Sequence, residues 1–152
     1  MATRLAPAPK ACTNFRLRQL TRRVTQFYDA ELGKAGLKTT QYALLSHVQK
    51  LGPVRPGELA RAMTMDASTL TRNLKPLVDA GWIELSAGSD ARSRTVTITD
   101  AGRARREAAR DDWQRAQKGL EARLGLARVL ALHALIDESL ALLDAPSEGE
   151  TA

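Results

Sequence analysis

Two short helical patterns separated by a few residues constrain the fold of this 152-residue chain more than any other feature of its sequence. The first helix is predicted between Pro56 and Met63, because proline suits a first helical position, where its missing N–H would have no partner. Asp66 can cap the second helix, and Gly81 is placed to end it in a left-handed turn. Pro76 inside this helix is expected to kink it. Its apolar residues recur at i, i+4, i+7 and i+8, and they are Leu70, Leu74, Leu77 and Val78.

The outer face of the second helix is polar and cationic. It carries Ser68, Thr69, Thr71, Arg72 and Lys75. A short helix followed by such a helix is typical of a helix-turn-helix, whose second helix enters the major groove of DNA. Hydroxyl groups can donate to or accept from base edges, and an arginine can bond two acceptors of guanine at once. The alternative is an αα-hairpin in an ordinary helical domain with a solvated polar face.

A predicted two-stranded hairpin follows the two helices. Residues 82–85 form a β-like run, and residues 95–99 alternate hydroxyl and aliphatic side chains at period two. The loop between them is small and cationic, and it contains Asp90, Arg92 and Arg94. An arginine at such a tip fits the narrow, electronegative minor groove, whereas the alternative is a solvated surface turn. A helix-turn-helix followed by a basic wing predicts binding to double-stranded DNA through the polar helix face and these three wing residues.

The segments that carry these features resemble the MarR family of winged helix-turn-helix transcription regulators. They are LARAMTMDASTLTRNLKPLVDAGWIEL and DARSRTVTITDAG. The family's Asp-x-Arg wing pattern falls on Asp90 and Arg92, and its Leu/Ile-Thr…Gly pattern falls on Ile98, Thr99 and Gly102. The resemblance extends over nearly the whole chain. It implies a mostly α fold of the α+β winged-helix class, which forms a homodimer through its first helix and its last two.

Helical periodicity predicts the elements around the motif. A first helix from about Thr13 to Ala35 has a wide apolar face, which comprises Leu17, Leu20, Val24, Phe27, Tyr28 and Leu32. Gly33 and Gly36 are expected to break it. A second helix runs from about residue 39 to 51, and its inward residues are predicted to be Tyr42, Leu45, Val48 and Leu51. Residues 54 and 55 are expected to form a very short strand that joins the wing sheet.

A long helical pair is predicted after the wing. Thr99 caps one helix of about 25 residues that runs to Leu124, and Gly125 breaks it. Residues 126–143 are too apolar for a surface helix with one buried stripe, because their large residues form more than one face: Val129, Leu132, Leu135, Ile136, Leu140 and Leu143. A single small domain cannot cover that surface, so a partner helix is expected to do so.

The predicted organisation is a single domain with short flanking segments. The parts are a disordered lead-in (1–12), a MarR-like domain (13–143) made of a winged helix-turn-helix (37–99) and dimerisation helices (13–35 and 100–143), and a disordered tail (144–152).

Charge and composition limit the possible function classes. The net charge is +6, with +5 over residues 1–36, +3 over 37–99 and −2 over 100–152, and a basic front part suits a polyanionic partner. No apolar run approaches the ~18 residues of a membrane span, so a cytoplasmic protein without membrane association is expected. Two histidines and one cysteine give no metal-ligand spacing, and there is no phosphate-binding loop or nucleophile elbow. Neither an enzyme nor a bound cofactor is therefore expected.

Two modes of regulation are left open. Cys12 precedes the first helix beside Lys10 and near Arg16, and cations at a helix N-terminus raise thiol reactivity. Some members of the MarR family sense peroxide through such a cysteine, although an incidental thiol is the alternative here. Other members bind an aromatic or phenolic ligand between the dimer helices and the winged domain. The side chains that could line such a pocket, or else belong to the core, include Phe27, Tyr28 and Tyr42.

The predicted function is a sequence-specific regulator of transcription that binds a pseudo-palindromic operator in double-stranded DNA as a homodimer. Repression released by a small aromatic ligand or an oxidant is the expected mode of action. Two alternatives are a redox-sensing regulator that acts through Cys12 and a winged-helix module that binds protein.

Overall fold

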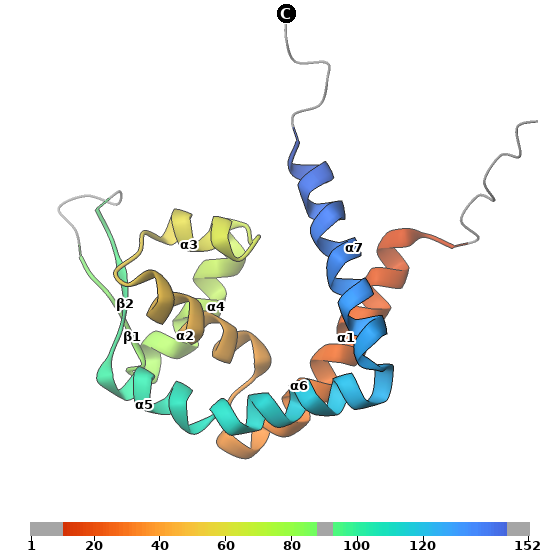
Figure 1. Cartoon of the computed structure of the whole chain (residues 1–152). Helices are drawn as coiled ribbons and strands as arrows, with labels where there is room; N and C mark the ends of the chain where they lie inside the picture. Colours follow the sequence, from red (N-terminus) through yellow and green to blue (C-terminus); the bar gives the residue numbers. More distant parts are fainter. Residues whose placement is uncertain (1–10, 88–92, 146–152) are drawn as a thin grey trace, which may run out of the picture. The chain divides into compact units, whose positions relative to one another are not determined.

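The computed structural model describes residues 11–87 and 93–145 of the chain. Its elements are, in chain order, α1 (Thr13–Leu32), the 3-10 helix η1 (Gly33–Ala35), α2 (Thr39–Leu51), α3 (Pro56–Ala62), α4 (Ala67–Asp79), β1 (Ile83–Leu85), β2 (Val96–Ile98), α5 (Asp100–Ala108), α6 (Arg110–Leu124) and α7 (Leu126–Asp144) (Figure 1). The described residues are mostly helical with a two-stranded antiparallel sheet, so the predicted fold class is confirmed. The chain divides into two compact units, of which the first ends at Ala116 and the second starts at Gln117.

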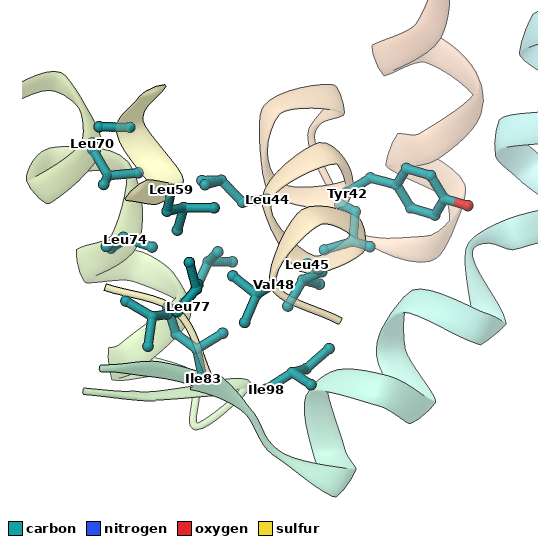
Figure 2. Close-up of a cluster of buried hydrophobic side chains, with 14 of the residues drawn as sticks. Tyr42, Leu44, Leu45, Val48, Leu59, Leu70, Leu74, Leu77, Ile83 and Ile98 are labelled. Carbon is teal, nitrogen blue, oxygen red and sulfur yellow. The ribbon is translucent and has the colours of Figure 1, made fainter. Parts of the chain in front are cut away.

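Helix α2 is the centre of the first unit, because it contacts α1, α3, α4, α5 and β2. Leu45 and Val48 are fully buried, as predicted (Figure 2). Two details of the predicted α2 face are wrong. Leu44, which was left out of it, is fully buried on the side of Leu59, whereas Leu51 is 45% exposed. Since neighbouring elements surround α2, its buried surface is wider than one stripe, and its last residue is left in solvent.

The apolar face of α4 completes this core together with α3 and the sheet. The buried side chains that Figure 2 labels are Leu59, Leu70, Leu74, Leu77, Ile83 and Ile98, and Val96 is buried with them. Val78 was predicted to belong to the same stripe but is 39% exposed. At 3.6 residues per turn, a residue eight positions after Leu70 has rotated about 80° away from it around the helix axis. Val78 therefore lies at the edge of the buried face.

Hydrogen bonds made by neighbouring residues define the start of α4. The Thr69 N–H donates to Asp66 Oδ1 at 2.7 Å, so the predicted N-cap is confirmed. The helix then continues through Pro76 to Asp79, although Pro76 has no N–H to donate.

The end of α4 is a Schellman motif. The Gly81 N–H donates to the Val78 carbonyl and the Trp82 N–H donates to the Leu77 carbonyl, both at 2.9 Å. Gly81 has a φ of 72°, which a residue without a Cβ adopts without strain. The predicted left-handed end of this helix is therefore confirmed, and it directs the chain into the wing.

The wing sheet has three participating segments. Strands β1 and β2 pair with Ile83 opposite Ile98 and Leu85 opposite Val96. Val54 joins them through a single bridge to Val96, with N–H···O distances of 3.1 and 2.8 Å. The predicted short strand before α3 is thus present as one bridge.

The turn from the sheet into α5 is closed by Thr99 and Gly102. Thr99 Oγ1 donates to the Gly81 carbonyl at 2.7 Å and accepts from the Gly102 N–H at 3.0 Å, so Thr99 caps this helix as predicted. A Cβ on Gly102 would collide with the Trp82 carbonyl oxygen and would lie 2.9 Å from Ile98 Cγ1. The close approach of α5 to the strand entry therefore requires a glycine at this position.

The predicted single helix between Thr99 and Leu124 is wrong. Helix α5 ends at Ala108 and α6 begins at Arg110, with the buried Ala109 between them. Two carboxylates, Asp111 and Asp112, lie in the first turn of α6, where the helix dipole favours negative charge. Acidic residues at these two positions favour the start of a helix, and the spacing of apolar residues does not reveal this.

The predicted end of α1 is also corrected. Gly33 has a φ of −60°, in the right-handed helical region, and it is the first residue of η1. It therefore does not interrupt the helical conformation. The left-handed residue is Gly36, with a φ of 69°. The two predicted glycines therefore have different roles, because only Gly36 adopts a conformation that disfavours other residues.

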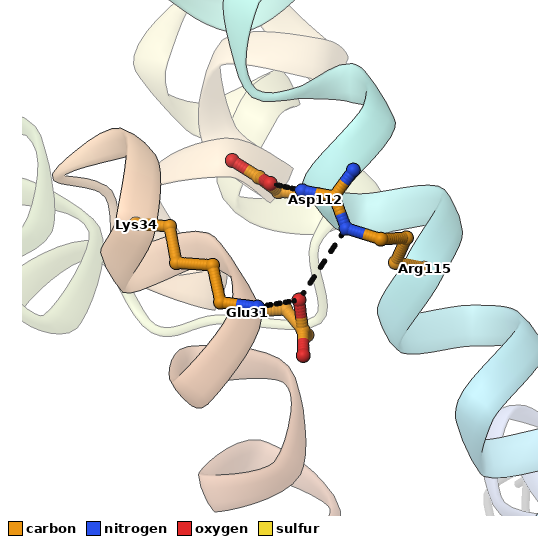
Figure 3. A network of polar contacts seen from close by, with 4 residues as sticks. All are labelled: Glu31, Lys34, Asp112 and Arg115. Carbon is orange, nitrogen blue, oxygen red and sulfur yellow. Dashed lines mark hydrogen bonds and ion pairs between the residues drawn. The ribbon is translucent and has the colours of Figure 1, made fainter.

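A polar network joins α1 and α6 within the first unit (Figure 3). Arg115 pairs with Asp112 and also lies 3.5 Å from Glu31, whose second partner, Lys34, is at 2.6 Å. The hydrogen bond from Lys34, and then the contact with Arg115, lower the pKa of Glu31. Asp112 is buried, so its pairing with Arg115 offsets the cost of removing a carboxylate from water.

The second unit contains α7, which follows Gly125 at a φ of 82°. Val129 is buried, but the exposed large apolar residues of this helix are Leu126, Leu130, Leu135, Ile136, Leu140, Leu142 and Leu143. A single chain leaves them in solvent. None of the helices in the described part of the chain combines the length and the apolarity that a membrane span requires.

Candidate nucleic-acid interface

The polar face of α4 lies opposite the face that packs into the core. Ser68, Thr71, Arg72 and Lys75 are exposed, and Thr69 is partly exposed. The leucines on the other side of the helix are buried. Because α4 is anchored through those leucines, its five predicted DNA-binding residues share one accessible surface of a rigid helix.

Asp66 holds two of these side chains as well as the helix N-terminus. The Ser68 hydroxyl donates to Asp66 Oδ1 at 2.7 Å, and the Thr69 hydroxyl donates to Asp66 Oδ2 at 3.0 Å. The sequence predicted the backbone cap but not these two bonds. The signal that could have found them is an Asp followed by hydroxyl residues two and three positions later, since such side chains bond locally.

The same bonds set the protonation state of Asp66. The hydrogen bond from Ser68 and then those from Thr69 lower the pKa of Asp66 from 3.8 to about 2. A carboxyl group with a lower pKa in the folded state stabilises the fold above its unfolded-state pKa, and this contribution is lost as the pH falls toward the folded-state value. Asp66 is therefore a carboxylate that only accepts hydrogen bonds at neutral pH.

Arg72 and Lys75 are the cations of this face. Arg72 Nη2 lies 3.4 Å from Thr69 Oγ1, a long contact that leaves the guanidinium group free to turn. Lys75 Nζ is 2.8 Å from Asp79 Oδ2, but both side chains are mostly exposed, so the pair stabilises little. Arg72 can thus present two donors to guanine, and Lys75 can exchange its partner for a phosphate.

The base of the wing loop is closed by Ser86 and Thr95. The Ser86 N–H donates to the Thr95 carbonyl at 2.9 Å, and the Thr95 N–H donates to Ser86 Oγ at 3.0 Å. Arg94 is exposed beside this base. The other two predicted wing residues, Asp90 and Arg92, lie outside the described residues.

Arg105 supports the wing from α5. Its guanidinium carbon lies 5.1 Å from the ring centre of Trp82, which precedes β1, and its Nη2 packs so closely on Gly36 that a Cβ there would collide with it. Its Nε is buried and has no hydrogen-bond partner among the described residues. The contact with the face of Trp82 is a cation–π interaction that stabilises this charge. The sequence analysis missed this role, because the three residues are far apart in the chain.

Two further exposed cations lie on α3 and were also missed. Arg55 is the N-cap residue of α3, and Arg61 lies in its last turn. The first helix of a helix-turn-helix crosses the DNA backbone. Their position on this helix was the signal that could have identified them as phosphate-binding candidates.

The residues predicted for ligand binding are mainly packed inside the first unit. Tyr42 is buried and stacks on Trp113 with ring centres 5.9 Å apart. Tyr28 is buried, and Phe27 is partly buried. Tyr42 is thus a core residue, and a ligand pocket lined by these aromatic residues stays a prediction.

Cys12 is exposed at the N-cap position of α1, where its carbonyl accepts from the Arg16 N–H at 3.1 Å. A redox role for this thiol stays a prediction. Within residues 11–87 and 93–145, no group of three or more His, Cys, Asp or Glu side chains is arranged to hold a metal ion.

Known proteins with similar sequences carry the same motif. The model of the MarR family matches residues 35–93. The uncharacterized HTH-type transcriptional regulator YxaD of Bacillus subtilis (strain 168) is 31% identical over 96 residues, which cover 62% of this chain and 67% of YxaD. The chain spans 61% of the length of YwoH, another uncharacterized HTH-type regulator of that organism.

Solved structures extend the similarity beyond the motif. A probable transcriptional regulator from Pseudomonas aeruginosa matches with a TM-score of 0.73 and 31% identity, over 83% of this chain and 95% of that chain. The M. tuberculosis transcriptional regulator MosR, solved in complex with DNA, matches with a TM-score of 0.74 and 29% identity, over 89% of this chain and 100% of that chain. On its motif, its winged-helix fold and these similarities, the chain belongs to the MarR family.

Proposed function

We propose that this protein regulates transcription by binding a specific, pseudo-palindromic site in double-stranded DNA as a homodimer, and that a small ligand or an oxidant relieves the repression. The observation that carries the proposal is the polar face of α4, where Ser68, Thr71, Arg72 and Lys75 are exposed on a helix anchored by its opposite face. MosR, which is similar in fold, was solved in complex with DNA. A regulator of this kind acts on the chromosome, so we expect it in the cytoplasm.

Selection of bound sequences from random duplex DNA tests this function. We expect enrichment of one near-palindromic sequence whose half-sites are about one helical turn apart, roughly 34–36 Å. Affinity for that sequence should fall steeply with salt, because binding to phosphates releases counterions. A pool without enrichment, or binding that salt does not change, would instead favour a winged-helix module that binds protein.

The wing gives a separate prediction. Arg92→Ala should reduce affinity for many DNA sequences to a similar extent, because an arginine at the minor groove or a phosphate contributes mainly through its charge. The slope of log affinity against log salt concentration should become less steep by roughly one unit. Lys118→Ala removes an exposed charge from α6 and serves as the charge-matched control. An unchanged slope for Arg92→Ala would show that Arg92 does not contact the DNA.

The homodimer is proposed from the apolar residues that the single chain leaves exposed. They occur on α7 and also on the first half of α1, where Phe15, Leu17 and Leu20 are exposed. Exposed apolar residues gathered on a helix mark an interaction site, and most soluble oligomers are symmetric assemblies of one chain. A two-fold dimer would also present two recognition helices to a near-palindromic site.

We expect the protein to have twice the mass of one chain in solution at micromolar concentration. Leu135, which is 62% exposed, gives a suitable test, because Leu135→Glu places a charge on the exposed surface of α7 without disturbing a buried side chain. This variant should keep its helical circular dichroism spectrum but sediment as a monomer or a weaker dimer. A monomeric mass for the unaltered protein would contradict the proposed assembly.

A further inference from the structure

We propose that Asp66 makes the Ser68 hydroxyl a hydrogen-bond acceptor only, so that this position of the recognition helix selects a base with an amino group in the major groove, adenine or cytosine. Ser68 is then a specificity-determining residue, and Asp66 is a positioning residue that acts through it. The inference rests on the proposed function, because it requires the outer face of α4 to meet base edges.

The direction of the Ser68 proton follows from its partner. A serine hydroxyl has one proton to donate and two lone pairs that accept. Ser68 Oγ lies 2.7 Å from Asp66 Oδ1. An ionised carboxylate has no proton to donate, so the hydroxyl proton of Ser68 lies between the two oxygens. Both lone pairs of this exposed hydroxyl remain available on its other side.

The Thr69 hydroxyl also donates its proton to Asp66, but it is less accessible than the Ser68 hydroxyl. Its hydroxyl donates to Asp66 Oδ2 at 3.0 Å, and Arg72 Nη2 approaches its oxygen at 3.4 Å. Thr69 is also only partly exposed, whereas Ser68 is exposed. Of the two hydroxyls that Asp66 binds, Ser68 is therefore better placed to meet a base.

An acceptor discriminates among bases where a free hydroxyl does not. In the major groove, adenine presents its N6 amino group and cytosine its N4 amino group, whereas guanine and thymine present acceptors. A freely rotating serine hydroxyl can satisfy either kind. With its proton bound to Asp66, Ser68 can pair only with an amino group, and the oxygen of guanine or thymine would face a lone pair and a carboxylate.

Arg72 complements this preference. It lies four residues after Ser68, so the two side chains are neighbours on one face of α4. Its guanidinium group only donates, and it suits the two acceptors of guanine. The recognition helix would thus offer a half-site one hydrogen-bond acceptor, the Ser68 oxygen, and several donors, the N–H groups of Arg72.

The test uses base analogues in the DNA site that the selection identifies. Each adenine of a half-site is replaced in turn by purine, which lacks the N6 amino group, and each cytosine by pyrimidin-2-one, which lacks the N4 amino group. At one position, loss of the amino group should weaken binding of the unaltered protein by about 2–12-fold, as expected for one hydrogen bond. Ser68→Ala should bind the natural and the modified duplex at that position equally.

A second variant tests the role of Asp66. In Asp66→Ser, a hydroxyl oxygen remains to cap the Thr69 N–H, so α4 should stay folded, but the carboxylate that binds the Ser68 proton is removed. The selected sequences should then admit guanine or thymine at the Ser68 position. The measured quantity is the ratio of affinities between duplexes, since loss of a negative charge raises affinity for all DNA. A merely structural role of Asp66 would weaken every duplex equally and leave this ratio unchanged.

The outcomes separate this inference from the proposed function. Two results would overturn the inference while DNA binding stands. In the first, the protein binds a specific site, but Ser68→Ala does not change the effect of removing any amino group. In the second, Ser68→Ala loses a preference for guanine or thymine. An unchanged base preference in Asp66→Ser overturns the role of Asp66. Failure of the unaltered protein to bind any specific site overturns the proposed function itself.

Discussion

Gly102→Ala should destabilise the fold strongly. A Cβ at this position would collide with the Trp82 carbonyl oxygen, and Ile98 Cγ1 would be 2.9 Å away. The clashing oxygen belongs to the backbone at the entry to β1, and it accepts the Thr99 N–H at 3.0 Å, so it cannot move without breaking the sheet-to-helix turn. Overpacking of this kind costs about 3 kcal/mol, which corresponds to a loss of roughly 6–12 °C in the melting temperature of a chain of this size.

Gly57→Ala is the matched control. Gly57 lies in α3 with open space around its Cα, so an added methyl group meets no neighbour. Alanine should be neutral or slightly stabilising there, because it restricts the unfolded chain and favours the helix. Both variants are compared by thermal unfolding at one protein concentration, since assembly would change the melting temperature. Equal melting temperatures for Gly102→Ala and the unaltered protein would contradict the close packing of α5 on the wing.

Arg72→Ala should weaken binding to the selected DNA site by about 1–3 kcal/mol, or about 5–150-fold in Kd. Arg72 is exposed on the outer face of α4, and its contact with Thr69 Oγ1 is long, at 3.4 Å. The fold should therefore be unaffected, and the melting temperature should stay that of the unaltered protein. The selected site should lose its preference at one guanine.

Arg72→Lys separates charge from geometry. Lysine keeps the positive charge but lacks the planar fork that bonds two acceptors of guanine. This variant should retain the salt dependence of the unaltered protein and still lose most of the preference for guanine. If both Arg72 variants keep their affinity and their base preference, α4 does not contact bases through Arg72.

Local features of the winged helix were predictable from the sequence alone. The N-caps at Asp66 and Thr99 and the left-handed end at Gly81 are confirmed, and α6 ends before Gly125 as predicted. Each depends on groups within a few residues of one another, so the residue types and their spacing carry the information. The motif and its resemblance to the MarR family rest on the same short-range patterns, as does the polar face of α4.

Other features required the packed structure. Periodicity predicted that Leu51 and Val78 are buried, but both are exposed. How much of a helix is buried depends on the elements that pack around it. Helix α2 contacts several elements, so more than one of its faces is buried. The break between α5 and α6 likewise falls at a residue, Ala109, that is buried in the core.

The contacts that position the candidate interface are also tertiary. Arg105 meets Trp82 and Gly36, which come from the wing and from the turn before α2, and no sequence spacing links the three. The direction of the Ser68 hydrogen bond is different, because its partner Asp66 is only two residues away and the contact is local. Local sequence thus determined the caps of α4 and α5 and which face of α4 is polar. Only the assembled structure decided which side chains are covered, because burial depends on atoms that folding brings together from distant parts of the chain.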